Sequence, residues 1–246
     1  MIVAEGPDQS APGTGERAKE RSVSAAVEDY AKAIHHLEAE HGGAVTTNVL
    51  AERLGVTPAA VSGMLKKLDD LGMVVYLPYR GVRLSEAGRR AALGVIRRHR
   101  LLELYLAETL DLSWDRVHDE AETLEHGLSP ALCELIATKL GEPQVDPHGD
   151  PIPTRDGRLA AVRGRPMSTL EVGDTGRVVR VSDRDPDHLR FLSDCRIGLG
   201  DTVTVVGTEP DGTRLVRNTS ATQLVPGPVA AAVWIEAGDP GDAVTR

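Results

Sequence analysis

The sequence is poor in aromatic residues and in cysteine. Aromatic residues make up 3% of the 246 positions, so the hydrophobic cores must be built mainly from leucine, valine, isoleucine and alanine. The two cysteines, Cys133 and Cys195, form no CxxC pattern. We therefore expect both to be reduced, which fits the cytoplasm, and we expect no structural disulfide.

Long apolar runs are also missing. No stretch reaches the roughly 18 apolar residues that mark a membrane span, and the N-terminus lacks the apolar segment that marks a secretory signal. The hydrophobic content of 41% and the charged content of 26% are ordinary for a globular protein. These observations predict a cytoplasmic chain of two or three domains with no membrane partner.

Positive charge is scarce overall but concentrated in one segment. The chain has a formal net charge of −9, whereas residues 53–100 contain ten lysines and arginines against three acidic residues. A basic segment within an acidic protein provides a local electrostatic footprint for a phosphate backbone. This segment therefore predicts contact with nucleic acid.

Two short helices joined by a glycine turn are predicted at the start of the basic segment. A helix over 46–54 ends at Gly55, and Thr57 and Pro58 provide the N-cap and first position of a helix over 58–71. Two such helices around a tight turn are typical of a helix-turn-helix unit. A longer amphipathic helix is expected just before them, over 24–41.

A β-hairpin is predicted directly after the second short helix. Apolar residues alternate on either side of Pro78-Tyr79-Arg80-Gly81, which predicts a turn with a basic tip. The order of these parts predicts a winged helix-turn-helix domain over residues 23–92. The alternative is a small helical core with an incidental hairpin.

A stretch rich in histidine and glutamate follows, from Arg97 to His126. It predicts two helices, over 86–110 and 114–126, with Ser113 as the N-cap of the second. Imidazole and carboxyl groups share one face of each helix: His99, Glu103, His118, Glu122, Glu125 and His126. Such groups converging from neighbouring helices are typical of a first-row transition-metal site. The alternative is a solvated face of acidic helices.

The helical part continues into a predicted dimerisation surface. Ser129 and Pro130 open a helix over 130–140, and the three helices have more apolar surface than a lone winged helix can cover. Self-association would bury that surface, and a symmetric dimer would present two recognition helices to a palindrome. We therefore predict a helical metal-binding and dimerisation domain over 93–142.

The composition changes in the C-terminal half. Residues 143–166 are rich in proline, glycine and charge, which predicts a linker. Short valine-, isoleucine- and leucine-bearing runs over 167–237 predict a small all-β barrel. The ends, 1–22 and 238–246, are expected to be a disordered arm and a frayed tail.

The order of these parts resembles the diphtheria-toxin-repressor family of metal-activated transcriptional repressors. The residues that carry the resemblance are RRHRLLE at 97–103, VHDEAETLEHGLS at 117–129 and the GDPIP run in the linker. The resemblance covers about residues 24 to 236. It implies a homodimer that binds palindromic double-stranded operator DNA when loaded with metal, and an SH3-like β domain.

The resemblance implies two metal sites. The positions of the primary site are Asp29, Glu122, Glu125 and His126, and those of the ancillary site are His99, Glu103 and His118. In some members the β domain completes the ancillary site with an acid and an amide three residues apart. The matching positions look like Asp185 and His188, the alternative being an exposed loop acid and a satisfied loop histidine.

The resemblance also indicates the metal. Iron-responsive relatives place Met and Cys where this chain has Asp29 and Glu122, which is the pattern of the manganese-responsive branch. Carboxylate oxygens make a harder site that suits Mn²⁺, although Fe²⁺, Co²⁺ or Zn²⁺ can also bind such a site in vitro. A binuclear manganese subtype has a Glu where this chain has Lys32. The implied targets are genes of manganese uptake or efflux.

The implied mechanism connects metal to DNA. Without metal the acids at 29, 122 and 125 should repel one another, and a cation should tie the first helix to the helix over 114–126. The residues expected at the DNA are Thr57, Ala59, Ser62 and Gly63 near base edges, and Lys66, Lys67, Arg80 and Arg83 at phosphates. Gly63 replaces a family Gln, so the operator sequence does not follow from the resemblance.

Three other functions remain open at this point. One is an iron-responsive repressor of the same family. Another is a metal-independent winged-helix regulator whose β domain senses a small molecule, and the third is a helical two-metal enzyme. Because no separate general base is apparent, we expect neither an enzyme nor a small organic substrate.

Overall fold

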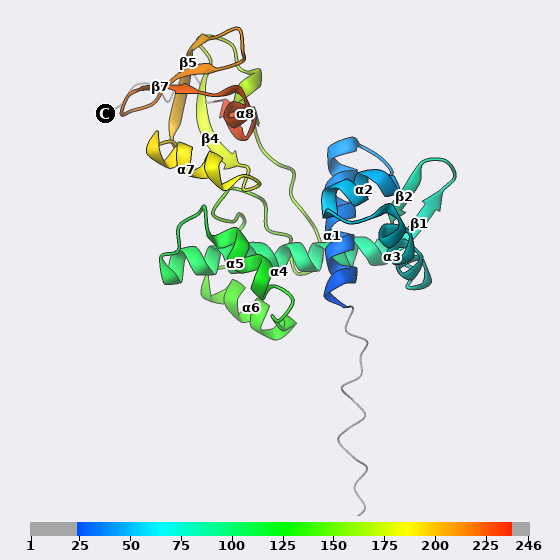
Figure 1. Ribbon diagram of the computed structural model, residues 1–246. Coiled ribbons are helices and arrows are strands. Elements are labelled where there is room, and N and C mark those ends of the chain that lie inside the picture. The colour runs from blue at the N-terminus through cyan, green and yellow to red at the C-terminus, as the bar shows by residue number, and fades with distance from the viewer. Residues whose placement is uncertain (1–23, 238–246) are drawn as a thin grey trace, which may run out of the picture.

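The computed structural model describes residues 24–237, so the predicted arm and the predicted tail lie outside the described residues. Three parts are arranged around one long helix, α4 (Figure 1). A winged helix lies at one end of α4, two shorter helices pack along its other half, and a β domain stands beside the second half.

The winged helix begins with three helices, α1 (Ala25–His41), α2 (Thr47–Leu54) and α3 (Pro58–Asp70). Threonine side chains cap the two shorter ones: Thr46 accepts from the Val49 amide, and Thr57 from the Ala60 amide. The apolar faces of the three helices meet in one core, whose fully buried members include Val27, Ile34, Leu50, Val61 and Leu68. The predicted helices therefore form where their hydrophobic periodicity placed them.

The predicted hairpin is present as β1 (Val74–Leu77) and β2 (Gly81–Leu84), paired antiparallel. Val45, just before α2, forms a β-bridge with Val82 of β2 and so attaches the wing to the helices. The turn itself projects into solvent, with Tyr79 fully exposed. The basic tip is thus available to a partner.

Helix α4 (Glu86–Leu110) is the element that connects the parts. Ser85 caps it by accepting from the Gly88 amide. Its first half packs on α1, and its second half packs on α5 (Val117–Leu124) and α6 (Pro130–Lys139). The predicted domain boundary after residue 92 falls inside this continuous helix.

Helix α5 is shorter than predicted, because it begins at Val117 and not at residue 114. The carbonyl of Trp114 accepts from Nε2 of His148 at 2.7 Å, and the Trp114 ring stacks on that imidazole. The carbonyl of Ser113 accepts from the amides of both Arg116 and Val117, which forms a turn. A tertiary contact therefore replaces the first helical turn, and Ser113 is not the N-cap of α5.

The β domain is a six-stranded antiparallel sheet in the order β3-β8-β4-β5-β6-β7. Its strands are β3 (Arg165–Pro166), β4 (Thr175–Val181), β5 (Thr202–Thr208), β6 (Arg214–Arg217), β7 (Thr222–Val225) and β8 (Val233–Ala237). Short helices η1 (Met167–Thr169), α7 (Pro186–Asp194) and α8 (Gly227–Ala231) complete it. Valine and isoleucine from alternate strand positions fill its core.

The predicted fold class is confirmed: a winged helix, a helical domain and a small β domain follow one another along the chain. Within the described residues, no helix is both long and apolar enough to cross a membrane.

Candidate metal centre and nucleic-acid interface

His99 lies at the centre of the charged residues that helices α1, α4 and α5 bring together. Its two ring nitrogens face different partners, because Nδ1 lies 2.7 Å from Glu125 and Nε2 lies 3.1 Å from Glu103. The two predicted clusters therefore lie side by side and share this imidazole. Glu103 and Glu125 are both completely buried.

The first cluster joins α1 to α5. Nε2 of His126 lies 2.8 Å from Asp29 and 3.4 Å from Glu125, and these three residues place one possible ligand atom each within 4.8 Å of one another. Glu122 belongs to an overlapping group with His99 and Glu125. Three of the four residues predicted for the primary site are thus brought together, and Glu122 lies beside them in the group that shares Glu125.

A lysine lies within this cluster. Nζ of Lys32 donates to Glu122 at 2.7 Å and to both oxygens of Glu125, at 2.8 and 3.0 Å. The sequence predicted that the acids would simply repel one another without metal. That expectation is corrected, because an ammonium group from the same chain lies between two of them and offsets one of their charges.

The second cluster is completed from the β domain by Asp183. Glu103 Oε1 lies 3.1 Å from His99 and 3.3 Å from His118, and Nδ1 of His118 lies 3.0 Å from Asp183. One ligand atom from each of these four residues lies within 4.8 Å of the others. The loop after β4 therefore delivers a carboxylate to helices α4 and α5.

The expectation that Asp185 and His188 complete this cluster is corrected. Asp185 caps α7, where its side chain accepts from the Asp187 amide, and its carboxylate lies 3.5 Å from His188. Neither residue belongs to a cluster of possible ligands within the described residues. The reason is the loop geometry. Asp183 lies two residues before the cap and contacts His118 of α5, whereas the Asp185 side chain is occupied as the N-cap of α7.

Sequence reasoning also missed two buried residues in the predicted linker. Asp146 and His148 form a group of possible ligands with Glu103, and all three are buried. Arg100 pairs with Asp146 at 3.5 Å. The available signal was the alternation of Asp146, His148 and Asp150 between proline and glycine, which is unusual for a solvated linker.

Hydrogen bonding controls the protonation of the second cluster. Hydrogen bonds to Asp183 and Glu103 raise the pKa of His118 to about 10. Burial would lower the pKa of His99, but hydrogen bonds to Glu103 and Glu125 outweigh it and raise that pKa to about 9. Burial would raise the pKa of Glu103, yet its histidine partners lower it to about 2. These shifts favour ionised carboxylates and imidazoles that hold their protons, so a metal ion that binds here must compete with protons.

These residues fit a divalent metal ion. They offer carboxylate oxygens and imidazole nitrogens, the donor types that manganese, iron and zinc accept. Two buried atoms, Oε2 of Glu103 and Nδ1 of His148, have no hydrogen-bond partner among the described residues. Buried polar atoms are normally paired, so unpaired ones beside other ligand atoms indicate room for a ligand.

The predicted DNA-binding residues lie on one exposed face of the winged helix. The positions on α3 and the wing are all exposed: Thr57, Ala59, Ser62, Gly63, Lys66, Lys67, Arg80 and Arg83. Val61, Leu65 and Leu68 of α3 point into the core instead. A helix with one buried and one basic, exposed face can enter a groove of DNA.

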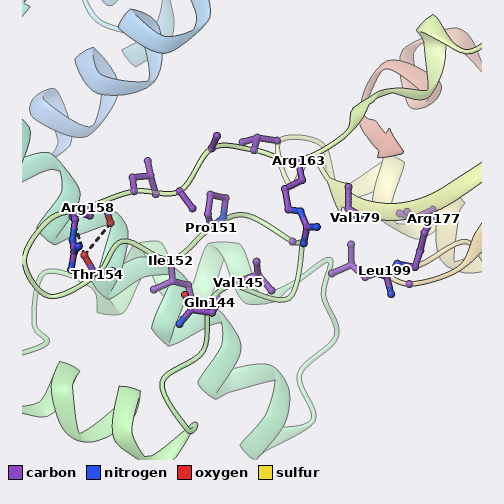
Figure 2. A pocket seen from close by; sticks show the side chains of 17 residues that line it. Gln144, Val145, Pro151, Ile152, Thr154, Arg158, Arg163, Arg177, Val179 and Leu199 are labelled. Atoms are coloured by element: carbon purple, nitrogen blue, oxygen red, sulfur yellow. Dashed lines mark hydrogen bonds between the residues drawn. The ribbon is translucent and has the colours of Figure 1, made fainter. Parts of the chain in front are cut away.

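A groove away from these clusters has a different lining. A groove of about 830 Å³ lies between the segment 144–163 and strand β4 (Figure 2). Its lining includes Val145, Ile152, Val179 and Leu199 with three arginines, and it contains no histidine, cysteine or acidic residue from the part of the chain that the structure describes. Among the described residues, the groove therefore lacks the side chains that could bind a metal ion, unlike the two clusters.

Comparison with known proteins agrees with this arrangement. Residues 22–82 match the iron dependent repressor N-terminal DNA binding domain, and residues 85–154 match the iron dependent repressor metal binding and dimerisation domain. Residues 165–237 match the FeoA domain. The three matches follow the three parts of the fold.

Several individual proteins are similar over most of their length. The diphtheria toxin repressor of Corynebacterium diphtheriae is 30% identical over 189 residues, which cover 73% of this chain and 83% of that protein. A solved manganese-dependent transcriptional repressor in complex with manganese is 40% identical, with a TM-score of 0.80, and the match covers 86% of this chain and 100% of that one. ScaR with bound Cd²⁺ is 26% identical, with a TM-score of 0.74, over 86% of this chain and 99% of that one.

Proposed function

This chain belongs to the iron-dependent repressor family, that of the diphtheria toxin repressor, and from that premise we propose that manganese is its signal. It is a metal-dependent transcriptional repressor with a DNA-binding domain. We further propose that it binds palindromic operator DNA as a homodimer and controls manganese homeostasis genes. The observation that carries the manganese assignment is the sulfur-free donor set of the two clusters.

The donor chemistry favours a hard divalent ion. Asp29, Glu122, Glu125 and His126 would hold one ion, and His99, Glu103, His118 and Asp183 a second. Every donor is oxygen or nitrogen, whereas softer ions are selected by cysteine and methionine sulfur. The solved repressor with bound manganese that this chain resembles supports the same choice. Zn²⁺ and Co²⁺ rank above Mn²⁺ in intrinsic affinity, so selectivity in cells would depend on geometry and availability.

The positions of these residues explain how metal binding would affect the orientation of the DNA-binding helices. A bound divalent cation would supply positive charge that neutralises the carboxylates. Asp29 lies on α1, and α1 packs directly on α2, α3 and β2 of the winged helix. The orientation of α1 against α5 therefore sets the orientation of α3 against the helical domain. Metal and DNA should each raise the affinity for the other.

The proposed contacts with DNA follow from the exposure and the charge of the side chains on α3 and the wing. Lys66, Lys67, Arg80 and Arg83 would contact phosphates and make binding weaken with salt, while Thr57, Ala59, Ser62 and Gly63 would lie nearest the bases. In a two-fold dimer the two α3 helices would enter successive major grooves, about 34–36 Å apart.

The test is a binding selection followed by titration. Full-length protein, stripped with a chelator, is used to select duplexes from a random palindrome library with and without Mn²⁺. Fluorescence anisotropy of the enriched duplex then measures affinity as buffered Mn²⁺, Fe²⁺ and Zn²⁺ are varied. We expect enrichment only with metal, and a response to Mn²⁺ within the range of free Mn²⁺ in cells.

The matched variant is Asp29→Ala. Removing this carboxylate should lower DNA affinity at saturating Mn²⁺ by at least about 100-fold, because α1 loses its bond to the metal site. Lys139→Ala, at the exposed end of α6, is the control and should bind Mn²⁺ normally. Binding that is indifferent to chelator and to Asp29→Ala would refute the metal-dependent mechanism.

A further inference from the structure

The lysine within the Asp29 cluster has a role of its own. The Lys32 side chain is 13% exposed, and its ammonium group makes three hydrogen bonds to the carboxylates of Glu122 and Glu125. Glu125 is completely buried, so its charge requires a compensating group. Among described residues, Lys32 is the only lysine that contacts a residue of either metal cluster.

We propose that Lys32 is an internal counter-cation that competes with the metal ion for the oxygens of Glu122 and Glu125, and so sets how much free metal the site needs. This inference rests on the proposed function, because it assumes that the Asp29 cluster holds metal. The competition is direct at Glu125, since its Oε1 accepts from Nζ at 2.8 Å and also lies 3.4 Å from Nε2 of His126, within the group of possible ligands that Asp29 completes.

The charge count supports one ion at this cluster. When His126 is neutral, as a metal ligand must be, Asp29, Glu122 and Glu125 contribute three negative charges and Lys32 one positive charge, which leaves two for a single divalent cation to balance. The nearby Glu28 is already paired with Arg98 at 2.8 Å. A second divalent ion would bring excess positive charge next to the ammonium group, so Lys32 favours one metal ion here over two.

Lys32 and Asp29 also lie about one turn apart on the same helix. Without metal, α1 is attached to the end of α5 both through the Lys32 ammonium group and through Asp29, which lies 2.8 Å from His126. With metal, Asp29 would remain at this end of α5 as a ligand, whereas Lys32 would have to leave the glutamates. The cost of releasing Lys32 would raise the metal concentration at which the site fills.

The test compares full-length wild type with Lys32→Met and Lys32→Gln. Free Mn²⁺ is followed by the EPR signal of the hydrated ion during titration, and thermal unfolding is measured with and without Mn²⁺. We expect one binding step to tighten by about tenfold or more in both variants, since charge-assisted hydrogen bonds no longer compete. Without metal both variants should unfold at lower temperature, because the buried Glu125 loses its ammonium partner and keeps only its histidine contacts.

Lys139→Met is the control, because it removes the same charge from the exposed end of α6, and it should leave Mn²⁺ affinity unchanged. Unchanged or weaker Mn²⁺ binding in both Lys32 variants would overturn the inference. Wild-type protein that binds no Mn²⁺ would instead overturn the proposed function. The two failures are therefore distinguishable.

Discussion

Histidine behaves in opposite ways at different places in this protein. His99 and His118 lie among carboxylates, which raise the pKa of each well above its usual value. His36 lies on α1 among cations, including Arg100, Lys32 and Arg184. Burial first, and these charges second, lower the pKa of His36 to about 3. The protein thus favours the charged form of histidine in the metal cluster and the neutral form at His36 on α1.

This difference predicts acid sensitivity from His36. The unfolded chain would bind a proton at His36 below about pH 6.5, whereas the folded chain binds it only near pH 3. The free energy of unfolding therefore falls as the pH drops through this window. His36→Gln should remove about 2 kcal/mol of the stability loss between pH 7 and pH 5. Urea unfolding at both pH values, in chelating buffer, measures the difference.

The comparison of variant with wild type isolates His36, because all other titrating groups are shared. An identical pH dependence for the two proteins would contradict the assignment.

At the scale of elements, the segment 141–164 acts as more than a connection. It buries Asp146, His148 and Asp150, and His148 fixes the start of α5 through the Trp114 carbonyl. Gly149 makes this packing possible, because its φ is +86° and a Cβ there would lie 2.2 Å from the Val179 carbonyl oxygen. The segment therefore packs beside the second cluster and forms one of its sides.

Two glycines should respond to alanine in opposite directions. Gly149→Ala should destabilise by about 2 kcal/mol or more, because both the backbone conformation and the contact with β4 are disfavoured. Gly63 lies within α3, and no atom lies within 4 Å of the position that a Cβ would occupy there. Gly63→Ala should therefore stabilise by about 0.5–1 kcal/mol through helix propensity.

Guanidinium unfolding of the two variants measures both effects. Mn²⁺ affinity should fall only in Gly149→Ala, since His148 and Asp146 lie next to that glycine. A stabilising Gly149→Ala would show that the segment is not packed as described.

At the scale of the whole molecule, one loop connects all three parts. Asp183 contacts His118 of the helical domain, and the neighbouring Arg184 pairs with Glu40 at the end of α1. Glu40 also pairs with Arg53 of α2 at 2.6 Å. The β domain is therefore in contact with both the ancillary cluster and the winged helix, so its position depends on both.

Exposed apolar side chains on the helical domain predict the dimer. Large apolar side chains on α4, α5 and α6 are exposed by 45% or more: Leu110, Leu124, Leu132 and Leu135. Leu135→Glu should convert a dimer into a monomer at micromolar concentration, because a charge would be buried in the interface. Operator affinity should fall by at least about 100-fold, as one recognition helix would remain per molecule.

Light scattering after size-exclusion chromatography measures the change in mass. Leu224→Glu is the matched control, since Leu224 is 58% exposed on β7 and its replacement should leave the dimer intact. A dimeric Leu135→Glu protein would place the interface elsewhere.

Local patterns in the chain were enough to specify the elements and most of the candidate ligands. Periodicity, caps and glycine stops act over a few residues, so α1, α2, α3 and α4 lie within about one residue of their predicted ends. Helical spacing likewise put His99 beside Glu103, and His118 beside Glu122, because residues four apart share a face whatever the surroundings.

What completes those clusters depended on folding in three dimensions. Asp183 rather than Asp185, the buried Asp146 and His148, and Lys32 on the glutamates all depend on loops and helices far apart in sequence. A carboxylate in a loop has no periodicity to reveal which way it faces, and a lysine one turn after Asp29 looks solvated until another helix packs on it. Long-range packing, which no local pattern encodes, therefore fixed the chemistry of the site.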